Sequence, residues 1–151
     1  MMLREDIQNA LKEAMKAKDM ETVSAVRLII AGQKVKDVEA RGSGKDMASD
    51  QELMSMMQTM IKQRNESARI YREGGREELA EKEEKEIKVI ERFLPKQLSE
   101  EEMSDKISEI IEVIGASSIK DMGKVMAEIK AKYAGQIDMG KASSLIKAKL
   151  S

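Results

Sequence analysis

Apolar residues recur through the first forty positions with the spacing of amphipathic helices. Over residues 2–18 they follow the i, i+3, i+4, i+7 pattern that lines one helical face, formed by Leu3, Ile7, Ala10, Leu11, Ala14 and Met15. A second helix is predicted over residues 20–40, with Asp19 as N-cap and a broad apolar face of Val23, Val26, Leu28, Ile30, Val35 and Val38. Residues 41–44, which contain two glycines, then predict a loop.

Two further helices are predicted before residue 95. Ser49 and Glu52 have the spacing of a capping box, which places a helix start at residue 50. That helix would bury Leu53, Met57, Met60, Ile61, Ala68 and Tyr71, and would end at Gly74–Gly75, with Gly74 in the left-handed conformation. The next begins at Arg76 and has a charged centre, which predicts a solvated face with pairs such as Glu81 with Lys85. It should end at Leu94, because Pro95 lacks a backbone N–H.

The last third of the chain predicts three short helices, over residues 100–114, 119–133 and 139–150. Their predicted caps are Ser99 with Glu102, Ser118 with Asp121, and Asp138, and Gly115 closes the first. The fold class is therefore all-α. We predict an N-terminal helical hairpin module of about four helices over residues 1–94, followed by a small three-helix module over residues 95–151.

Composition removes most catalytic chemistry. The 151 residues include no Cys and no His, which excludes thiolate nucleophiles, imidazole bases and Cys/His zinc sites. The glutamate runs are typical of solvated faces rather than of metal ligands. We therefore predict no catalytic residue, no metal and no cofactor, and we expect that the isolated chain does not make amide from glutamine. Whether it catalyses another reaction stays open. The acidic start and the short apolar stretches predict neither export nor a membrane span, hence a cytoplasmic location.

Two features leave alternatives open. Met54, Met56, Met57 and Met60 indicate either core filler or an adaptable surface for a protein partner. Gly123 lies inside a predicted helix, where glycine costs up to about 1 kcal/mol relative to alanine. It therefore indicates close approach either by another helix or by a ligand.

Charge is unevenly distributed although the formal net charge is only −1. Residues 95–115 hold two lysines against six acidic residues, whereas residues 116–151 hold seven lysines against three. Residues 62–76 hold five basic residues against two acidic ones. Such patches can follow an RNA backbone, although basic helix faces are also common in other soluble proteins. The candidate RNA-binding residues are Lys120, Gly123, Lys124, Lys141, Lys147, Lys149, Arg69, Arg72 and Arg76.

Three segments, over residues 71–80, 93–99 and 115–126, resemble motifs of the GatB/YqeY family, and the resemblance spans essentially the whole chain. The positions that it marks as structural are Tyr71, Gly74, Gly75, Leu94, Pro95, Gly115, Asp121 and Met122. Near the end, where the family often has Gly-Arg-Ala-Asp-Gly, this chain has Gln136 in place of the arginine.

The resemblance implies a helical N-terminal part and a three-helix tail similar to the tail of the B subunit of the tRNA-dependent amidotransferase. That enzyme converts misacylated Glu-tRNA or Asp-tRNA to the amide form with ATP and glutamine, so the resemblance implies association with a carbon–nitrogen ligase that uses glutamine as amido-N-donor. The implied function is a tRNA-associated or amidotransferase-associated binding module. The implied partners are tRNA and an aminoacyl-tRNA amidotransferase or synthetase. The alternatives are a protein–protein adaptor without an RNA role, using the Met-rich face, and an accessory part of the ligase. The oligomeric state stays open.

Overall fold

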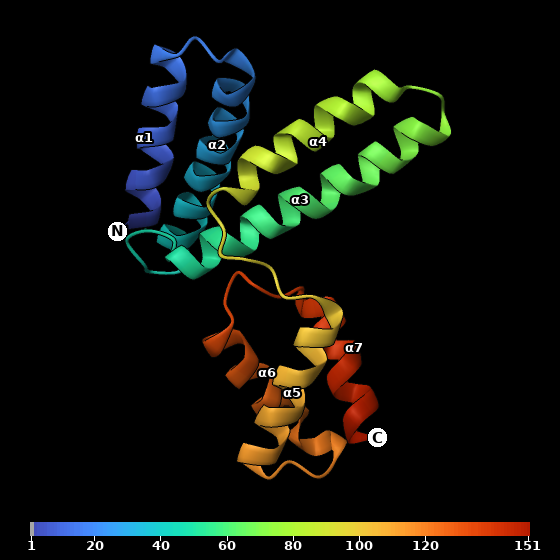
Figure 1. Cartoon of the computed structure of the whole chain (residues 1–151). Coiled ribbons are helices and arrows are strands. Elements are labelled where there is room, and N and C mark those ends of the chain that lie inside the picture. Colours follow the sequence, from blue (N-terminus) through green and yellow to red (C-terminus); the bar gives the residue numbers. More distant parts are fainter. Residues whose placement is uncertain (1) are drawn as a thin grey trace. The chain divides into compact units, whose positions relative to one another are not determined.

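The computed structural model describes residues 2–151, and the regular secondary structure in this range is helical throughout. The all-α prediction is confirmed. Figure 1 shows the helices in chain order, and the contacts divide them into two compact units that meet between Pro95 and Lys96. No helix in the described part of the chain is both long and apolar enough to cross a bilayer. The elements are α1 (Met2–Lys16), α2 (Met20–Gly42), α3 (Asp50–Glu73), α4 (Glu77–Glu91), α5 (Glu100–Ile114), the 3-10 helix η1 (Ile119–Asp121), α6 (Met122–Lys132) and α7 (Met139–Leu150).

The N-terminal unit consists of two helical hairpins. Figure 1 shows α1 beside α2, and α3 beside α4. The core residues come from all four helices and are at most 1% exposed, namely Ile7, Val26, Ile29, Leu53, Met57 and Ile90. Leu3, Ala10, Leu11, Met60, Ile61, Phe93 and Leu94 pack around them. Burial of this apolar surface stabilises the unit far more than the propensity of any single helix does.

The expected apolar face of α2 is only half correct. Val23 and Val26 are buried, but Leu28, Val35 and Val38 are exposed. Met15, expected on the buried stripe of α1, is exposed as well. At 100° per residue, Leu28 points well away from the buried Ile29, so the two cannot share one narrow interface. The sequence pattern marked too wide an arc of α2 as core.

Local capping signals set most helix starts. The Asp19 carboxylate accepts from the backbone N–H of Thr22, and the capping box of Ser49 and Glu52 is complete, so both expected starts are confirmed. The helix ends are less accurate. Lys18 has a positive φ and α1 stops at Lys16, while α2 runs two residues beyond its predicted end, through Gly42.

The turn between α3 and α4 uses the second glycine of its pair. Gly74 has φ −86°, whereas Gly75 has φ +74° and takes the left-handed conformation. The expectation that Gly74 would do so is wrong by one residue, because α3 continues through Glu73 and the tight turn comes one step later. Arg76 is the N-cap of α4 but forms no side-chain cap hydrogen bond.

The charged centre of α4 does more than face solvent. Arg64 Nε of α3 lies 2.9 Å from Glu86 Oε2, and both side chains are mostly buried. Arg72 forms ion pairs with Glu77 and Glu84, so arginines of α3 join the two helices of this hairpin. The expected pair of Glu81 with Lys85 is replaced by a 3.5 Å ion pair from Lys85 to Glu21 of α2.

The end of α4 comes earlier than expected. Its last helical residue is Glu91, and turn hydrogen bonds involving Arg92, Phe93 and Leu94 follow before Pro95. The side chain of Leu94 is half-buried against the N-terminal core, and Tyr71 is half-buried on α3. These two motif residues therefore contribute packing.

The C-terminal unit has its own core, formed by the three helices α5, α6 and α7. Its innermost side chains are Ile107, Val125, Ile129, Ile137 and Ile146, all 2% exposed or less. The capping box of Ser99 with Glu102, the left-handed Gly115 (φ +75°) and the cap by Asp138 are confirmed. The backbone N–H of Leu98 donates to the carbonyl of Gln136 at 2.8 Å, which ties the first residues of the unit to the loop before α7.

The middle helix of this unit differs from the prediction. Residues 119–133 were expected to form one α-helix, but the segment begins with the 3-10 helix η1 and continues as α6 only from Met122. The Asp121 carboxylate accepts from the backbone N–H groups of Ser117 and Ser118, at 3.0 and 3.4 Å. It thereby fixes the preceding loop rather than opening a regular α-helix.

Candidate functional site

Four of the lysine candidates lie exposed on the C-terminal unit. Lys120 belongs to η1, Lys124 to the first turn of α6, and Lys141 and Lys147 to α7. None of the four forms an ion pair with another of the described residues. Their ammonium groups are therefore available to an anionic ligand.

Lys120 and Lys124 are four residues apart in the segment that the sequence predicted as one helix over residues 119–133. In one continuous α-helix they would share a face. Since Lys120 lies in the 3-10 helix and Lys124 in α6, a helix-type change separates the two.

Gly123 is exposed between these lysines. A Cβ atom built on it would meet nothing within 4 Å. Close packing against another helix of the described chain therefore does not explain this glycine. The other alternative, close approach by a ligand, stays a prediction.

Asp121 and Met122 have structural roles. The hydrogen bonds that the Asp121 carboxylate accepts from the backbone N–H groups of Ser117 and Ser118 lower its pKa. The nearby charge of Lys124 lowers this pKa further. The carboxylate thus stays charged and holds the loop before η1. Met122 is half-buried against the C-terminal core.

Lys149 is already engaged within the unit. Its Nζ donates to Ser108 Oγ of α5 at 2.8 Å. On α7 it lies next to the buried Leu150, on the flank of the helix that faces α5. Lys149 therefore joins two helices, in contrast to Lys141 and Lys147.

Two of the three arginine candidates are engaged in ion pairs. Arg69 pairs with Glu66 and Glu73 on its own helix, and Arg72 with Glu77 and Glu84. These partners raise the pKa of both guanidinium groups above its ordinary value, chiefly through the hydrogen bonds that Arg69 donates to Glu66 and Arg72 donates to Glu84. Each pair would have to open for its arginine to meet a phosphate. Arg76 is exposed at the α3–α4 turn.

The methionine-rich segment of α3 is core. Met56 and Met57 are buried, and Met54 and Met60 pack on the same cluster. Gly32 of α2 leaves the space that Met56 occupies, because a Cβ there would lie 2.7 Å from its Sδ. The adaptor hypothesis thus loses the Met-rich face on which it was based.

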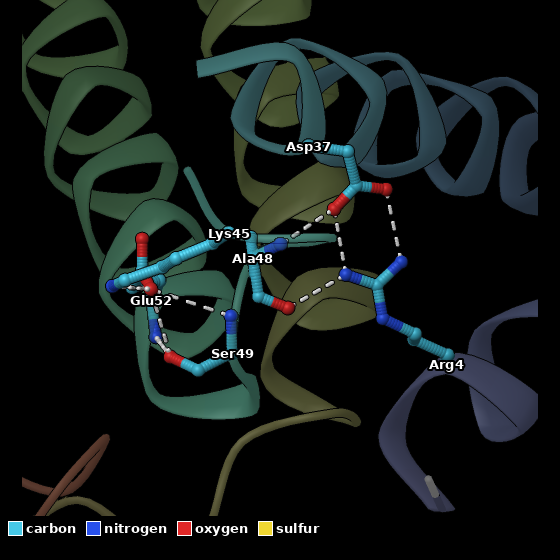
Figure 2. A network of polar contacts seen from close by, with 6 residues as sticks. All are labelled: Arg4, Asp37, Lys45, Ala48, Ser49 and Glu52. Carbon is cyan, nitrogen blue, oxygen red and sulfur yellow. Dashed lines mark hydrogen bonds and ion pairs between the residues drawn. The ribbon is translucent and has the colours of Figure 1, made fainter. Parts of the chain in front are cut away.

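A polar network fixes the connection between α2 and α3, and the sequence patterns did not predict it. Figure 2 shows Arg4 of α1 reaching Asp37 of α2, with distances of 2.7 and 3.0 Å, and the carbonyl of Ala48 at 2.8 Å. Asp37 also accepts from the backbone N–H of Ala48. Both charged side chains are only 16% exposed. The hydrogen bond from Arg4, followed by that from Ala48, lowers the pKa of Asp37 to about 2.

The described residues offer no cluster of carboxylates for a metal. Within residues 2–151, no group of three or more acidic side chains is close enough to hold an ion. The features that remain are an unpaired lysine surface on the C-terminal unit and, on α2, an exposed aliphatic row that sequence reasoning assigned to the core. The spacing of this aliphatic row, from Leu28 through Val35 to Val38, is visible in the sequence. The same spacing is expected for a buried face and for an exposed one, so it could not tell them apart.

These observations define a small all-helical protein of two units, with exposed lysines on one unit and an exposed aliphatic row on the other. The particular family follows from comparison: the YqeY-like protein family matches residues 4–150, and the chain belongs to that family. This is the family also found in the C-terminal tail of GatB, so the resemblance is confirmed.

Curated relatives carry the name "Altered inheritance of mitochondria protein 41, mitochondrial". The protein from Lachancea thermotolerans is 32% identical over 108 residues, which is 70% of this chain and 56% of that protein. The protein from Candida glabrata is 31% identical and covers 74% of this chain and 61% of its own length. The protein from Clavispora lusitaniae is 30% identical over 141 residues, with coverages of 91% and 79%. The chain thus spans little more than half of the first two relatives.

These names correct one expectation. The acidic first residues and the short apolar stretches led to the expectation of a cytoplasmic location, but the curated relatives described above are named as mitochondrial proteins, which contradicts it. The inference failed because acidic residues and short apolar stretches do not select among the compartments of a cell.

Proposed function

We propose that this YqeY-like protein binds tRNA through the exposed lysines of its C-terminal unit, as an RNA-associated module of the amidotransferase type. The observation that carries the proposal is the set of Lys120, Lys124, Lys141 and Lys147, exposed and without ion pairs in the described chain. Their segment, residues 116–151, carries seven lysines against three acidic residues. Lysines without internal partners can release counterions from an RNA backbone at little cost.

Gly123 supports the same surface. An exposed glycine with open space around it allows a phosphate group to approach the backbone N–H closely. Lys120 and Lys124 on either side would supply the positive charge. Arg69 and Arg72 contribute less to this proposal, since ion pairs within α3 and to α4 already neutralise them.

The test is a filter-binding measurement of total tRNA with the full chain at several salt concentrations. Binding should weaken as salt rises, and the variant with Lys120→Glu and Lys124→Glu should bind less tightly. The salt slope is the slope of the logarithm of the binding constant against the logarithm of the salt concentration. If each lysine neutralises about one phosphate, this slope should become flatter by about one to two units in the double variant. Exposed lysine substitutions cost within about 0.5 kcal/mol of stability, so the fold should persist.

A matched control carries the same charge change elsewhere. Lys12 and Lys16 are exposed on α1 and are also four residues apart, so their replacement by glutamate should leave the tRNA salt slope nearly unchanged. If both double variants lost tRNA affinity equally, the effect would be explained by net charge alone. That result would contradict the proposed surface. Absence of salt-dependent tRNA binding would instead favour an adaptor without an RNA role.

A further inference from the structure

Helix α2 carries a row of aliphatic side chains that the other helices of its unit leave uncovered. Leu28, Val35 and Val38 are 44%, 58% and 61% exposed, and Ala31 between them is exposed too. Their spacing of i, i+3, i+7 and i+10 is that of the a and d positions of a coiled coil. Isolated apolar residues on a surface are ordinary, but a continuous row at heptad spacing is the pattern of a helix-docking face.

The row is separate from the core face of the same helix. Val26 and Ile29 are completely buried, and Gly32 lets α3 approach closely through Met56. Figure 1 shows α2 with α1 along one side and the α3–α4 hairpin on another. The interior of the unit is therefore complete without the exposed row.

Positive charge runs along one edge of this row. Arg27, Lys34 and Arg41 are exposed and seven residues apart, each one position before a residue of the a series of the heptad. None of the three forms an ion pair within residues 2–151. On the other edge, formed by the e positions, the one acidic residue is Glu39, which is already paired with Lys36 at 3.3 Å. The face therefore has a basic edge on which Arg27 and Lys34 have no acidic partner in the described chain, whereas the charge of Arg41 also acts on Asp37.

We propose that this face of α2 binds an amphipathic helix of a partner protein, one whose aliphatic stripe is bordered by Asp or Glu. The aliphatic row supplies the apolar contact, and the basic edge selects acidic residues on the incoming helix. A second copy of this chain fits less well. An antiparallel copy would set the basic edges of the two helices against each other, and a parallel copy would offer only Glu39, which is already paired. RNA fits less well too, since the row offers no aromatic side chain for base stacking.

The experiment uses the full chain and two synthetic helices of about 20 residues, a length that spans three heptads. Both peptides carry leucine at the a and d positions. One has glutamate along the edge that would face Arg27, Lys34 and Arg41, and the other has lysine there. Fluorescence anisotropy should give a dissociation constant about tenfold or more lower for the glutamate peptide, a difference of about 1.4 kcal/mol.

Variants then locate the binding. Val35→Glu combined with Val38→Glu should weaken binding of the glutamate peptide by about tenfold or more. The matched control is Val113→Glu on α5, where the valine is 82% exposed, and it should bind like the parent. Arg27→Glu with Lys34→Glu should shift the preference toward the lysine peptide. Circular dichroism confirms that each variant folds.

Several outcomes would overturn the proposal. In the peptide measurement they are equal binding of the two peptides, absence of binding, or an equal loss of affinity in the Val113 control. In sedimentation, the contradicting result is a concentration-dependent dimer that the Val35 and Val38 substitutions abolish. Loss of tRNA binding in that same valine variant would assign the face to RNA and also overturn the proposal. The inference is independent of the tRNA proposal, because the Lys120 and Lys124 double variant should bind the glutamate peptide normally.

Discussion

At the scale of single residues, several side chains have roles that their type alone would not reveal. Asp121 and Asp37 are both aspartates with a lowered pKa, but the first closes a loop through nearby backbone N–H groups, and the second pairs with an arginine 33 positions away. Gly123 and Gly115 are both glycines in or beside helices. Only Gly115 has a backbone conformation that requires glycine. These contrasts lead to two predictions.

The first concerns Gly123. Replacement by alanine should raise the free energy of unfolding by a few tenths to about 1 kcal/mol, because the Cβ meets open space and alanine favours helix. Gly115→Ala, in contrast, should cost about 1 kcal/mol or more, because alanine is strained at φ +75°. Urea unfolding of both variants measures the difference. A destabilised Gly123→Ala protein would show that this glycine has a packing role after all.

The second concerns the pH dependence of Asp37. Its pKa is about 2 in the folded protein and is ordinarily near 3.8, so its ion pair stabilises the fold above pH 4 and is lost as pH falls toward 2. The shift corresponds to a stabilisation on the order of 2 kcal/mol, for a side chain that is 16% exposed. Asp37→Asn should therefore be less stable at pH 7 by at least that order.

The same variant should differ much less from the parent at pH 2, because folding then no longer favours the ionised carboxylate by much: Asp37 is about half protonated in the folded protein and almost fully protonated in the unfolded one. Chemical unfolding at the two pH values provides the comparison. Asp6→Asn, which changes an exposed aspartate on α1, is the control and should cost within about 0.5 kcal/mol at either pH. If the difference in stability between the parent and Asp37→Asn did not change with pH, the ionised carboxylate of Asp37 would not be the source of the stabilisation.

At the scale of elements, the helices begin where the capping residues are and end where tertiary context decides. The starts of α2, α3, α5 and α7 follow their caps. By contrast, α4 ends three residues before its predicted end, and the segment after Ser118 begins as a 3-10 helix. An N-cap acts within about one helical turn and can be read from a few residues. A helix end also depends on which following side chains are drawn into a core, as Phe93 and Leu94 are here.

The α3–α4 hairpin supplies the prediction at this scale. Arg64 and Glu86 are 15% and 18% exposed and join the two helices, whereas Arg69 pairs on the surface of α3. Arg64→Ala should cost about 1–3 kcal/mol, since it leaves Glu86 without its partner in a mostly buried position. Arg69→Ala should cost much less, because its ion pairs are exposed to solvent. Thermal or urea unfolding measures both variants. Equal losses of stability would mean that burial does not determine how much each ion pair contributes to the stability of the fold.

At the scale of the whole molecule, the chain forms two units, each with a core of its own. The N-terminal unit ends at Pro95 and the C-terminal unit begins at Lys96. We predict that fragments divided at this point fold independently, so that their far-ultraviolet circular dichroism spectra add up to that of the full chain. Each should also unfold cooperatively in urea. An N-terminal fragment without helical signal would show that the tail is needed to complete its fold.

The sequence by itself determined the all-helical class, the capped starts of the helices, the lack of Cys and His chemistry and the membership of the YqeY-like family. Those features depend on residue type and on interactions within a few positions. Only the tertiary structure decided which apolar residues of α2 are buried, which lysines lack partners, and that Arg4 meets Asp37. Periodicity defines a direction around a helix but not the neighbour that occupies it. The same row of valines can therefore indicate a core in the sequence and a docking face in the fold.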